Sequence, residues 1–197
     1  VYEDFNKYEN CIVPECFEGK DDVQSMFYSH ASRLLSANSI PTVYSGDGIC
    51  GIAFGYNVRI VPEERFHDGI ILDITAAQVL QNNGIDTGLI RVKDKFSCKE
   101  EHHLISDDYL RAVEGAFVYE TEISPKAEII SKVYNKEKSA VCSYYYENAL
   151  GQKFFIYTFE GYSLCNQLKR QYARTTDINY ILSNKFNRTL PVYVYGH

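Results

Sequence analysis

One stretch in the first half of the chain, residues 69–90, has the pattern of a strand that leads directly into a helix. Its apolar run Ile-Ile-Leu at 70–72 is typical of a short buried strand. Asp73 or Thr75 can cap the helix that follows, and Asn83-Gly84 supply a left-handed stop. The pattern therefore predicts a βα unit with Asp73 at the carboxyl end of its strand.

A second helix is predicted over residues 21–35, where apolar residues recur at helical spacing after Asp21-Asp22. These apolar positions are Val23, Met26, Phe27, Ala31, Leu34 and Leu35. Residues 41–44 then have the composition of a short strand. Alternating helices and strands are typical of a parallel sheet, so we expect an α/β part over about 20–90.

From about residue 91 the pattern changes to alternating apolar and polar positions, which predicts strands. The runs are 116–121, 128–133, 140–146 and 153–159. The last two flank a polar turn at 147–152 and are expected to pair as an antiparallel hairpin. A closing helical segment is predicted over 163–184, with a break at Thr175-Thr176-Asp177. We therefore expect one domain over 1–197, with a β-rich extension over about 91–160.

Composition narrows the possible partners of this chain. Its 197 residues fit a single domain, and a hydrophobic fraction of 45% with 23% charged residues is ordinary for a folded globular protein. The net charge is −6 and no basic run exceeds Lys169-Arg170, so we expect no nucleic-acid partner. No apolar run approaches the ~20 residues of a membrane span, so no membrane partner is expected.

The six cysteines are scattered and form no CxxC pair. This pattern favours buried thiols in a reducing compartment, and we expect a cytoplasmic protein. The first residue, Val1, is not a methionine, which predicts that the chain is part of a longer protein. Targeting signals can then lie outside these residues.

A glycine-rich segment, Gly46 to Gly51, matches the GxGxxG pattern after a predicted strand. Residues 52–57 lack the helical stripe that should follow in a dinucleotide site, so we expect a loop and no cofactor. Cys50 lies in this loop and is the candidate nucleophile, with His67 as its candidate base. A lone cysteine is more often a small buried hydrophobic residue.

Residues 98–103 bring together side chains that can ligate metals, namely Cys98, Glu100, Glu101, His102 and His103. Adjacent histidines point in different directions, so a tetrahedral zinc site needs ligands from elsewhere in the fold. The charges favour a solvated loop, and we expect no metal. Tyr144, Tyr145 and Tyr146 alternate across a predicted strand, so at least one is expected to face outward, where it can stack on a sugar.

Three stretches together resemble a known family. Gly69-Ile-Ile-Leu-Asp, followed by Ala76-Ala77, Leu80, Gly84 and Gly88, is similar to one of its segments, and Asn148 to Gly151 is similar to its hairpin turn. Leu190-Pro191, after the last helix, also fits. Over roughly residues 20–195, the chain resembles the trimerisation domain of family 42 β-galactosidases and related glycoside hydrolases.

The resemblance implies a flavodoxin-like, amidotransferase-like parallel sheet flanked by helices, with an antiparallel β-rich C-terminal edge. It implies no amidotransferase chemistry, because Cys50 lies in Gly-Ile-Cys-Gly-Ile and not in a G-x-C-x-G nucleophile elbow. The implied partners are a catalytic barrel domain of the same parent chain and further copies in a homo-oligomer. The glycosidase acid and nucleophile then lie outside this chain, since they need a barrel of ~250 residues.

These observations lead to a non-catalytic accessory domain of a β-galactosidase-like enzyme as the functional hypothesis. Tyr44, Asp47 and Asp73 are the candidate residues for one wall of the substrate cleft, because crevices open at the carboxyl ends of parallel strands. Two alternatives remain open. One is a small cysteine-dependent hydrolase or transferase that uses Cys50 with His67 or His103, and the other is a carbohydrate-binding module.

Overall fold

The computed structural model describes residues 2–3, 51–105, 110–136, 138–161 and 171–187. Within these ranges, eight strands form one mixed sheet in the order β1-β2-β3-β8-β7-β6-β4-β5. The strands are β1 (Tyr2–Glu3), β2 (Gly51–Phe54), β3 (Ile70–Leu72), β4 (Leu89–His103), β5 (Leu110–Ile123), β6 (Glu128–Asn135), β7 (Lys138–Glu147) and β8 (Lys153–Tyr157). The helices are the 3-10 helix η3 (Gly55–Ile60), α3 (Arg65–Asp68), α4 (Ile74–Asn82) and α5 (Gln171–Asn184).

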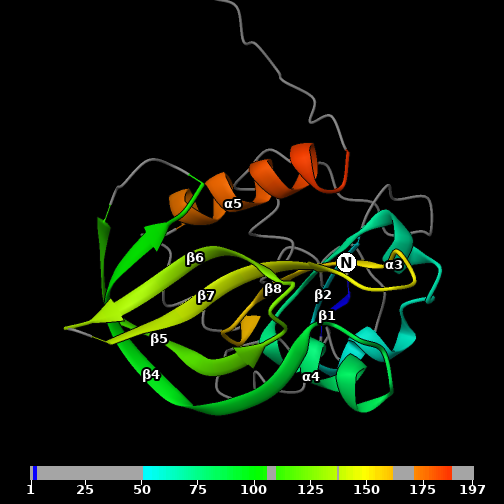
Figure 1. The fold of residues 1–197 in the computed structure, drawn as a ribbon, viewed down its shortest axis with the longest axis horizontal. Helices are drawn as coiled ribbons and strands as arrows, with labels where there is room; N and C mark the ends of the chain where they lie inside the picture. Colours follow the sequence, from blue (N-terminus) through cyan, green and yellow to red (C-terminus); the bar gives the residue numbers. More distant parts are fainter. Residues whose placement is uncertain (1, 4–50, 106–109, 137, 162–170, 188–197) are drawn as a thin grey trace, which may run out of the picture.

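The sheet has a parallel half and an antiparallel half (Figure 1). Strands β1, β2, β3 and β8 run parallel to one another, whereas β8, β7, β6, β4 and β5 alternate in direction. The antiparallel strands are the longer ones, with 15 residues in β4 and 14 in β5. The antiparallel half of the sheet curls, so that β5 approaches the end of β8. The amide of Tyr119 in β5 donates to the carbonyl of Thr158, just beyond β8, at 2.7 Å.

The expected flavodoxin-like parallel sheet flanked by helices is therefore wrong. The described residues form a mostly stranded mixed sheet with few helices. Turn lengths explain the difference. A parallel connection needs a crossover of about a dozen residues, whereas β5 to β6 and β7 to β8 are joined through only 124–127 and 148–152. Such short turns force antiparallel pairing, so antiparallel strands make up half of the sheet and not merely its edge.

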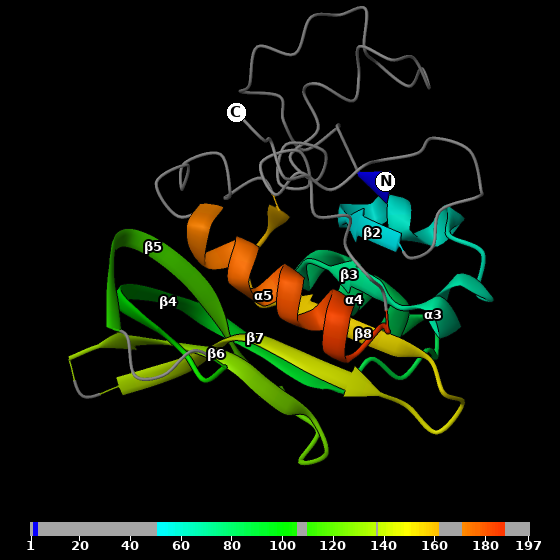
Figure 2. The ribbon, with the colours of Figure 1, turned by 90° about the horizontal axis from the view of Figure 1, so that it is seen from above.

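The few helices pack against parts of the two faces of the sheet. On one face α5 packs through Ile178, Ile181 and Leu182 against a cluster that includes Phe155 and Tyr157 of β8. On the opposite face α4 packs with η3 and α3 in a second cluster. Figure 2 shows α5 running diagonally across the strands. The core thus consists of two apolar layers separated by the sheet.

Two local predictions are confirmed. The βα unit exists as β3 followed by α4, with Asp73 at the N-cap and the positive φ of 86° at Gly84 after its end. Strands β7 and β8 pair as the expected antiparallel hairpin. The Asn148 side chain organises its turn, because Oδ1 accepts from the amides of Leu150 and Gln152 at 3.0 and 3.1 Å. Gly51–Phe54 form strand β2, which leads directly into the 3-10 helix η3.

Two other predictions are wrong. The expected solvated loop over 98–103 is part of β4, whose alternation of faces is interrupted by register shifts between Val92 and Lys95 and between Cys98 and Glu100. These shifts hide the period-two pattern in the sequence. The expected break at 175–177 does not occur, because α5 continues through these residues. The predictions of a helix over 21–35, a strand over 41–44 and a loop over 46–50 lie outside the described residues, as does Leu190-Pro191.

Gly69 lies at the point where α3 turns into β3, with a positive φ of 102°. A Cβ atom there would lie 2.5 Å from the ring of Phe186. We expect Gly69→Ala to lower the free energy of unfolding by about 2–3 kcal/mol, because it adds left-handed strain to a steric clash. Gly84→Ala is the matched control, since its φ is also positive but no atom lies within 4 Å of the added carbon. Urea unfolding of both variants checks this, and equal losses would contradict the role of the clash.

Candidate functional site

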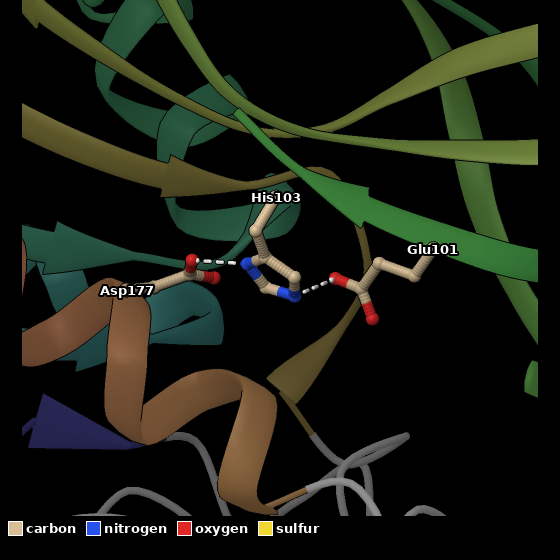
Figure 3. Close-up of side chains that lie close together, drawn as sticks. All are labelled: Glu101, His103 and Asp177. Carbon is tan, nitrogen blue, oxygen red and sulfur yellow. Dashed lines mark hydrogen bonds and ion pairs between the residues drawn. The ribbon is translucent and has the colours of Figure 1, made fainter. Parts of the chain in front are cut away.

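Four ionisable side chains meet between β4 and α5. They are Glu101 and His103 of β4 and Arg174 and Asp177 of α5, and none is more than 2% exposed. Figure 3 shows the ring of His103 between the carboxylates of Glu101 and Asp177. Ionisable groups are rarely buried this completely unless they are paired, so this cluster is the first candidate for a functional site.

Local geometry brings each pair to the interface. Positions 101 and 103 point to the same face of the strand, because side chains alternate along it. Positions 174 and 177 lie three residues apart on one face of α5. Ile178, Ile181 and Leu182 bury the same helix against the sheet, so the charged pair is carried into the core with them. The apolar second half of α5 thus places its charged pair opposite β4.

The four groups form a closed ring of contacts. His103 Nδ1 lies 2.7 Å from Asp177 Oδ1, and His103 Nε2 lies 3.3 Å from Glu101 Oε1. Arg174 completes the ring: one terminal nitrogen donates to Asp177 Oδ2 at 3.1 Å, and the other donates to Glu101 Oε1. Two of these contacts join β4 to α5, namely His103 with Asp177 and Arg174 with Glu101. The contacts of His103 with Glu101 and of Arg174 with Asp177 each lie within one element.

Burial and the neighbouring charged groups set the protonation states of the cluster. Burial disfavours ionisation of Glu101, but the charge of Arg174 and the contact with His103 lower the pKa of Glu101 to about 2. Burial also disfavours the charged form of His103, yet Asp177 and Glu101 raise its pKa to about 9. Burial raises the pKa of Asp177, against the opposing pull of His103 and Arg174. The short contact between His103 and Asp177 therefore holds one proton at neutral pH, and the cluster as a whole is neutral.

Aromatic rings and a thiol surround Arg174. Its guanidinium carbon lies 5.2 Å from the ring centre of Tyr157 and 5.3 Å from that of Phe159, within the range of cation–π contacts. The Cys142 Sγ lies 3.4 Å from Glu101 Oε1. Burial raises the pKa of Cys142 well above its usual value, so this thiol is kept protonated and is a poor nucleophile.

Glu101, His103 and Asp177 each place one potential metal-ligand atom within 4.8 Å of the others. The donor set argues against a metal here. Arg174 already donates to both carboxylates, and both nitrogens of His103 face carboxylates while the ring is protonated. A metal ligand must present a free lone pair, so the guanidinium takes the place that a cation would occupy.

A small hollow lies beside the cluster. Glu101, Arg174, Cys98, Cys142 and Phe159 contribute to its lining, and it has room for about one water molecule. A substrate of the size of a sugar cannot enter a space this small. Within the described residues, the cluster therefore has the composition of an active site, and the hollow beside it has room for about one water molecule.

Asp73, the cleft candidate within the described residues, is 3% exposed. Its Oδ1 accepts from the amides of Ala76 at 2.8 Å and Gly55 at 3.0 Å, and its Oδ2 accepts from the amide of Gly161 at 2.8 Å. The side chain thus caps α4 and also ties it to the residues that follow β2 and β8. This geometry gives Asp73 a structural role, and a role in a substrate cleft stays a prediction.

The other candidates are placed as follows. Tyr44, Asp47 and Cys50 lie outside the described residues, so the pairing of Cys50 with His67 or His103 stays a prediction. The expectation that a tyrosine of 144–146 faces outward is wrong, because the three are 0%, 9% and 6% exposed. Tyr144 and Tyr146 pack in the layer of α4, and Tyr145 packs in the layer of α5. Both faces of β7 are covered, which leaves no sugar-stacking surface there.

The sequence shows Glu101 and His103 among side chains that can ligate a metal, but it predicts a solvated loop there and names neither as a site residue. Arg174 and Asp177 are missed, because Thr175-Thr176-Asp177 predict a helix break. The signal that was available is the i, i+3 spacing of Arg174 and Asp177 beside the apolar positions of a helix.

Comparisons with known proteins do not identify a family for this chain. No protein-family model, no curated protein and no solved structure matches the chain. Among the helices of the described ranges, none combines the length and the apolar character that a membrane crossing requires.

Proposed function

We propose that this chain is a non-catalytic accessory domain of a β-galactosidase-like glycoside hydrolase. In this proposal it assembles with a catalytic barrel domain of the same parent chain and with further copies in a homo-oligomer. Its contribution to the enzyme is a folded surface, and the reacting carboxylates belong to the barrel.

One observation carries the proposal. The described groups best suited to chemistry are used to hold the fold together, since Glu101, His103, Arg174 and Asp177 pair with one another in the core. Asp73 likewise accepts three backbone hydrogen bonds. Retaining glycosidases need two carboxyl groups about 5–5.5 Å apart across an open sugar cleft, and buried carboxylates paired with arginine do not meet that need. The three stretches that resemble the trimerisation domain point to the enzyme class.

In this proposal, the contribution to the substrate cleft comes from Tyr44 and Asp47 and not from Asp73. Tyr44 ends the predicted strand 41–44 and Asp47 lies in the predicted loop after it, whereas the carboxylate of Asp73 is buried and accepts backbone hydrogen bonds. In the full-length parent we therefore expect Tyr44→Ala to change kcat/KM for an aryl β-galactoside without loss of folded protein.

The first experiment is light scattering of the isolated chain together with an assay on nitrophenyl β-galactoside. We expect a single oligomeric species whose mass is at least twice that of the 22.6 kDa chain, and no hydrolysis above a protein-free blank. Assembly without turnover is what an accessory domain requires. Thiol alkylation near neutral pH, followed by mass spectrometry, is the companion measurement, with Cys142 as the internal example of a protected thiol.

Two outcomes would overturn the proposal. One is a monomer with a fast-reacting Cys50, which would support the cysteine-dependent enzyme. The other is glycoside hydrolysis that copurifies with the chain and survives in a second preparation. Cys50→Ala is the control for the first outcome, because it removes that thiol.

A further inference from the structure

We infer that Glu101, His103, Arg174 and Asp177 form a latch that holds the first half of α5 on the sheet and opens when the cluster loses one proton. The inference is independent of the proposed function, since it concerns only the contact between α5 and β4.

The geometry divides α5 into two parts. Arg174 and Asp177 lie in its first half, and their side chains meet Glu101 and His103 of β4 in the core. Ile178, Ile181 and Leu182 lie in its second half and pack in the apolar layer. Loss of the polar contacts therefore frees one half of the helix, while the other half keeps its apolar contacts.

The cluster has a balanced charge that depends on a single proton. Glu101 and Asp177 contribute two negative charges, and Arg174 and protonated His103 contribute two positive charges. Among the described residues, Cys142 of β7 and Tyr157 of β8 also face the cluster, and burial keeps both neutral. Cys98 of β4 lines the hollow beside it. Loss of the proton leaves one uncompensated negative charge in the core, which is strongly unfavourable.

The composition of this interface also points to a latch. Four core positions carry ionisable side chains although they border an apolar layer. Apolar residues of similar volume are often equally stabilising or more so at such positions, because burying charge costs desolvation energy. An apolar contact would hold α5 at every pH, whereas this one holds it only while its charges balance.

The direction of the pH dependence follows from His103. Its pKa is raised from 6.5 to about 9 in the folded protein. The stability that it contributes is therefore fully present below pH 6.5 and is lost as the pH rises through about 9. Opening is expected on the alkaline side.

Amide hydrogen exchange of α5 between pH 6 and 10, corrected for the intrinsic pH dependence of exchange, tests the inference. We expect the protection of residues 174–178 to fall at least tenfold with a midpoint near pH 9. The protection of residues 181–184 should fall less, because their side chains keep the apolar contacts.

Two variants separate charge from packing. His103→Gln has the charge of the deprotonated cluster and should show low protection at every pH. His103→Gln combined with Asp177→Asn is neutral at every pH and should show high, pH-independent protection. Glu128→Gln is the control, because it breaks the exposed pair with Lys185 and should leave the alkaline step unchanged.

The inference is overturned if the wild-type protein shows no step, or if the neutral double variant shows the same step. Should His103→Gln fail to fold, the comparison of the wild-type protein with the double variant still decides.

Discussion

Replacement of Arg174 by methionine is expected to lower the free energy of unfolding by about 3–5 kcal/mol. Methionine retains much of the side-chain volume but removes the guanidinium that donates to Glu101 and Asp177. It leaves two buried carboxylates facing the single positive charge of His103. Because domains of this size are stable by only about 5–15 kcal/mol, the loss is a large share of the total. Urea unfolding followed by circular dichroism at pH 6 gives the measurement.

Two further variants show whether charge is the cause. Adding Glu101→Gln to Arg174→Met restores neutrality and should recover part of the lost stability. Lys93→Met removes a cation from an exposed pair with Glu122, where both side chains are at least 40% exposed, and should cost less than about 1 kcal/mol. If Arg174→Met costs no more than Lys93→Met, or if Glu101→Gln recovers nothing, the charge balance of the cluster does not hold α5.

Replacement of Asp73 by alanine is expected to lower the free energy of unfolding by about 4 kcal/mol. The change leaves the buried amides of Gly55, Ala76 and Gly161 without the carboxylate that accepts from them. Each unsatisfied buried donor costs about 1–3 kcal/mol. The loss should exceed that of an ordinary helix cap, about 1 kcal/mol, because the carboxylate joins three segments and not one.

Asparagine at position 73 is the graded test. Its single oxygen can still accept from Gly55 and Ala76, but its amide group would face the amide of Gly161, which is also a donor. Asp73→Asn should therefore fall between the wild-type protein and Asp73→Ala in urea unfolding. The exposed variant Glu122→Gln serves as the control for loss of a carboxylate at the surface. A loss near 1 kcal/mol for Asp73→Ala would mean that only the cap matters.

Several features of this protein depend on residues close together in the chain, and these were predictable. The βα unit and its Asp73 cap need only a strand, a capping residue and Gly84 within some fifteen residues. The β7–β8 hairpin needs only two alternating runs and a short turn. The sequence also shows histidines and acids together over 98–103, but it predicts a solvated loop there and not a buried cluster.

The tertiary structure decided the rest. Asp177 lies 74 residues from His103, and Arg174 lies 73 residues from Glu101, so no local pattern relates them. Charged residues are stable in a core only when such partners are present. Without knowledge of these partners, the residues of this segment predict a solvated loop. The direction of the long strands followed from how many residues connect them, and this overruled the fold that short motifs implied.

The tyrosines of β7 show the same division. Alternation along a strand correctly separates Tyr145 from Tyr144 and Tyr146, because side chains alternate between faces. Whether a face meets water depends on what packs there, and α5 covers one face while α4 covers the other. The sequence by itself determined which way each side chain points, and only the packed fold determined that both directions lead into the core.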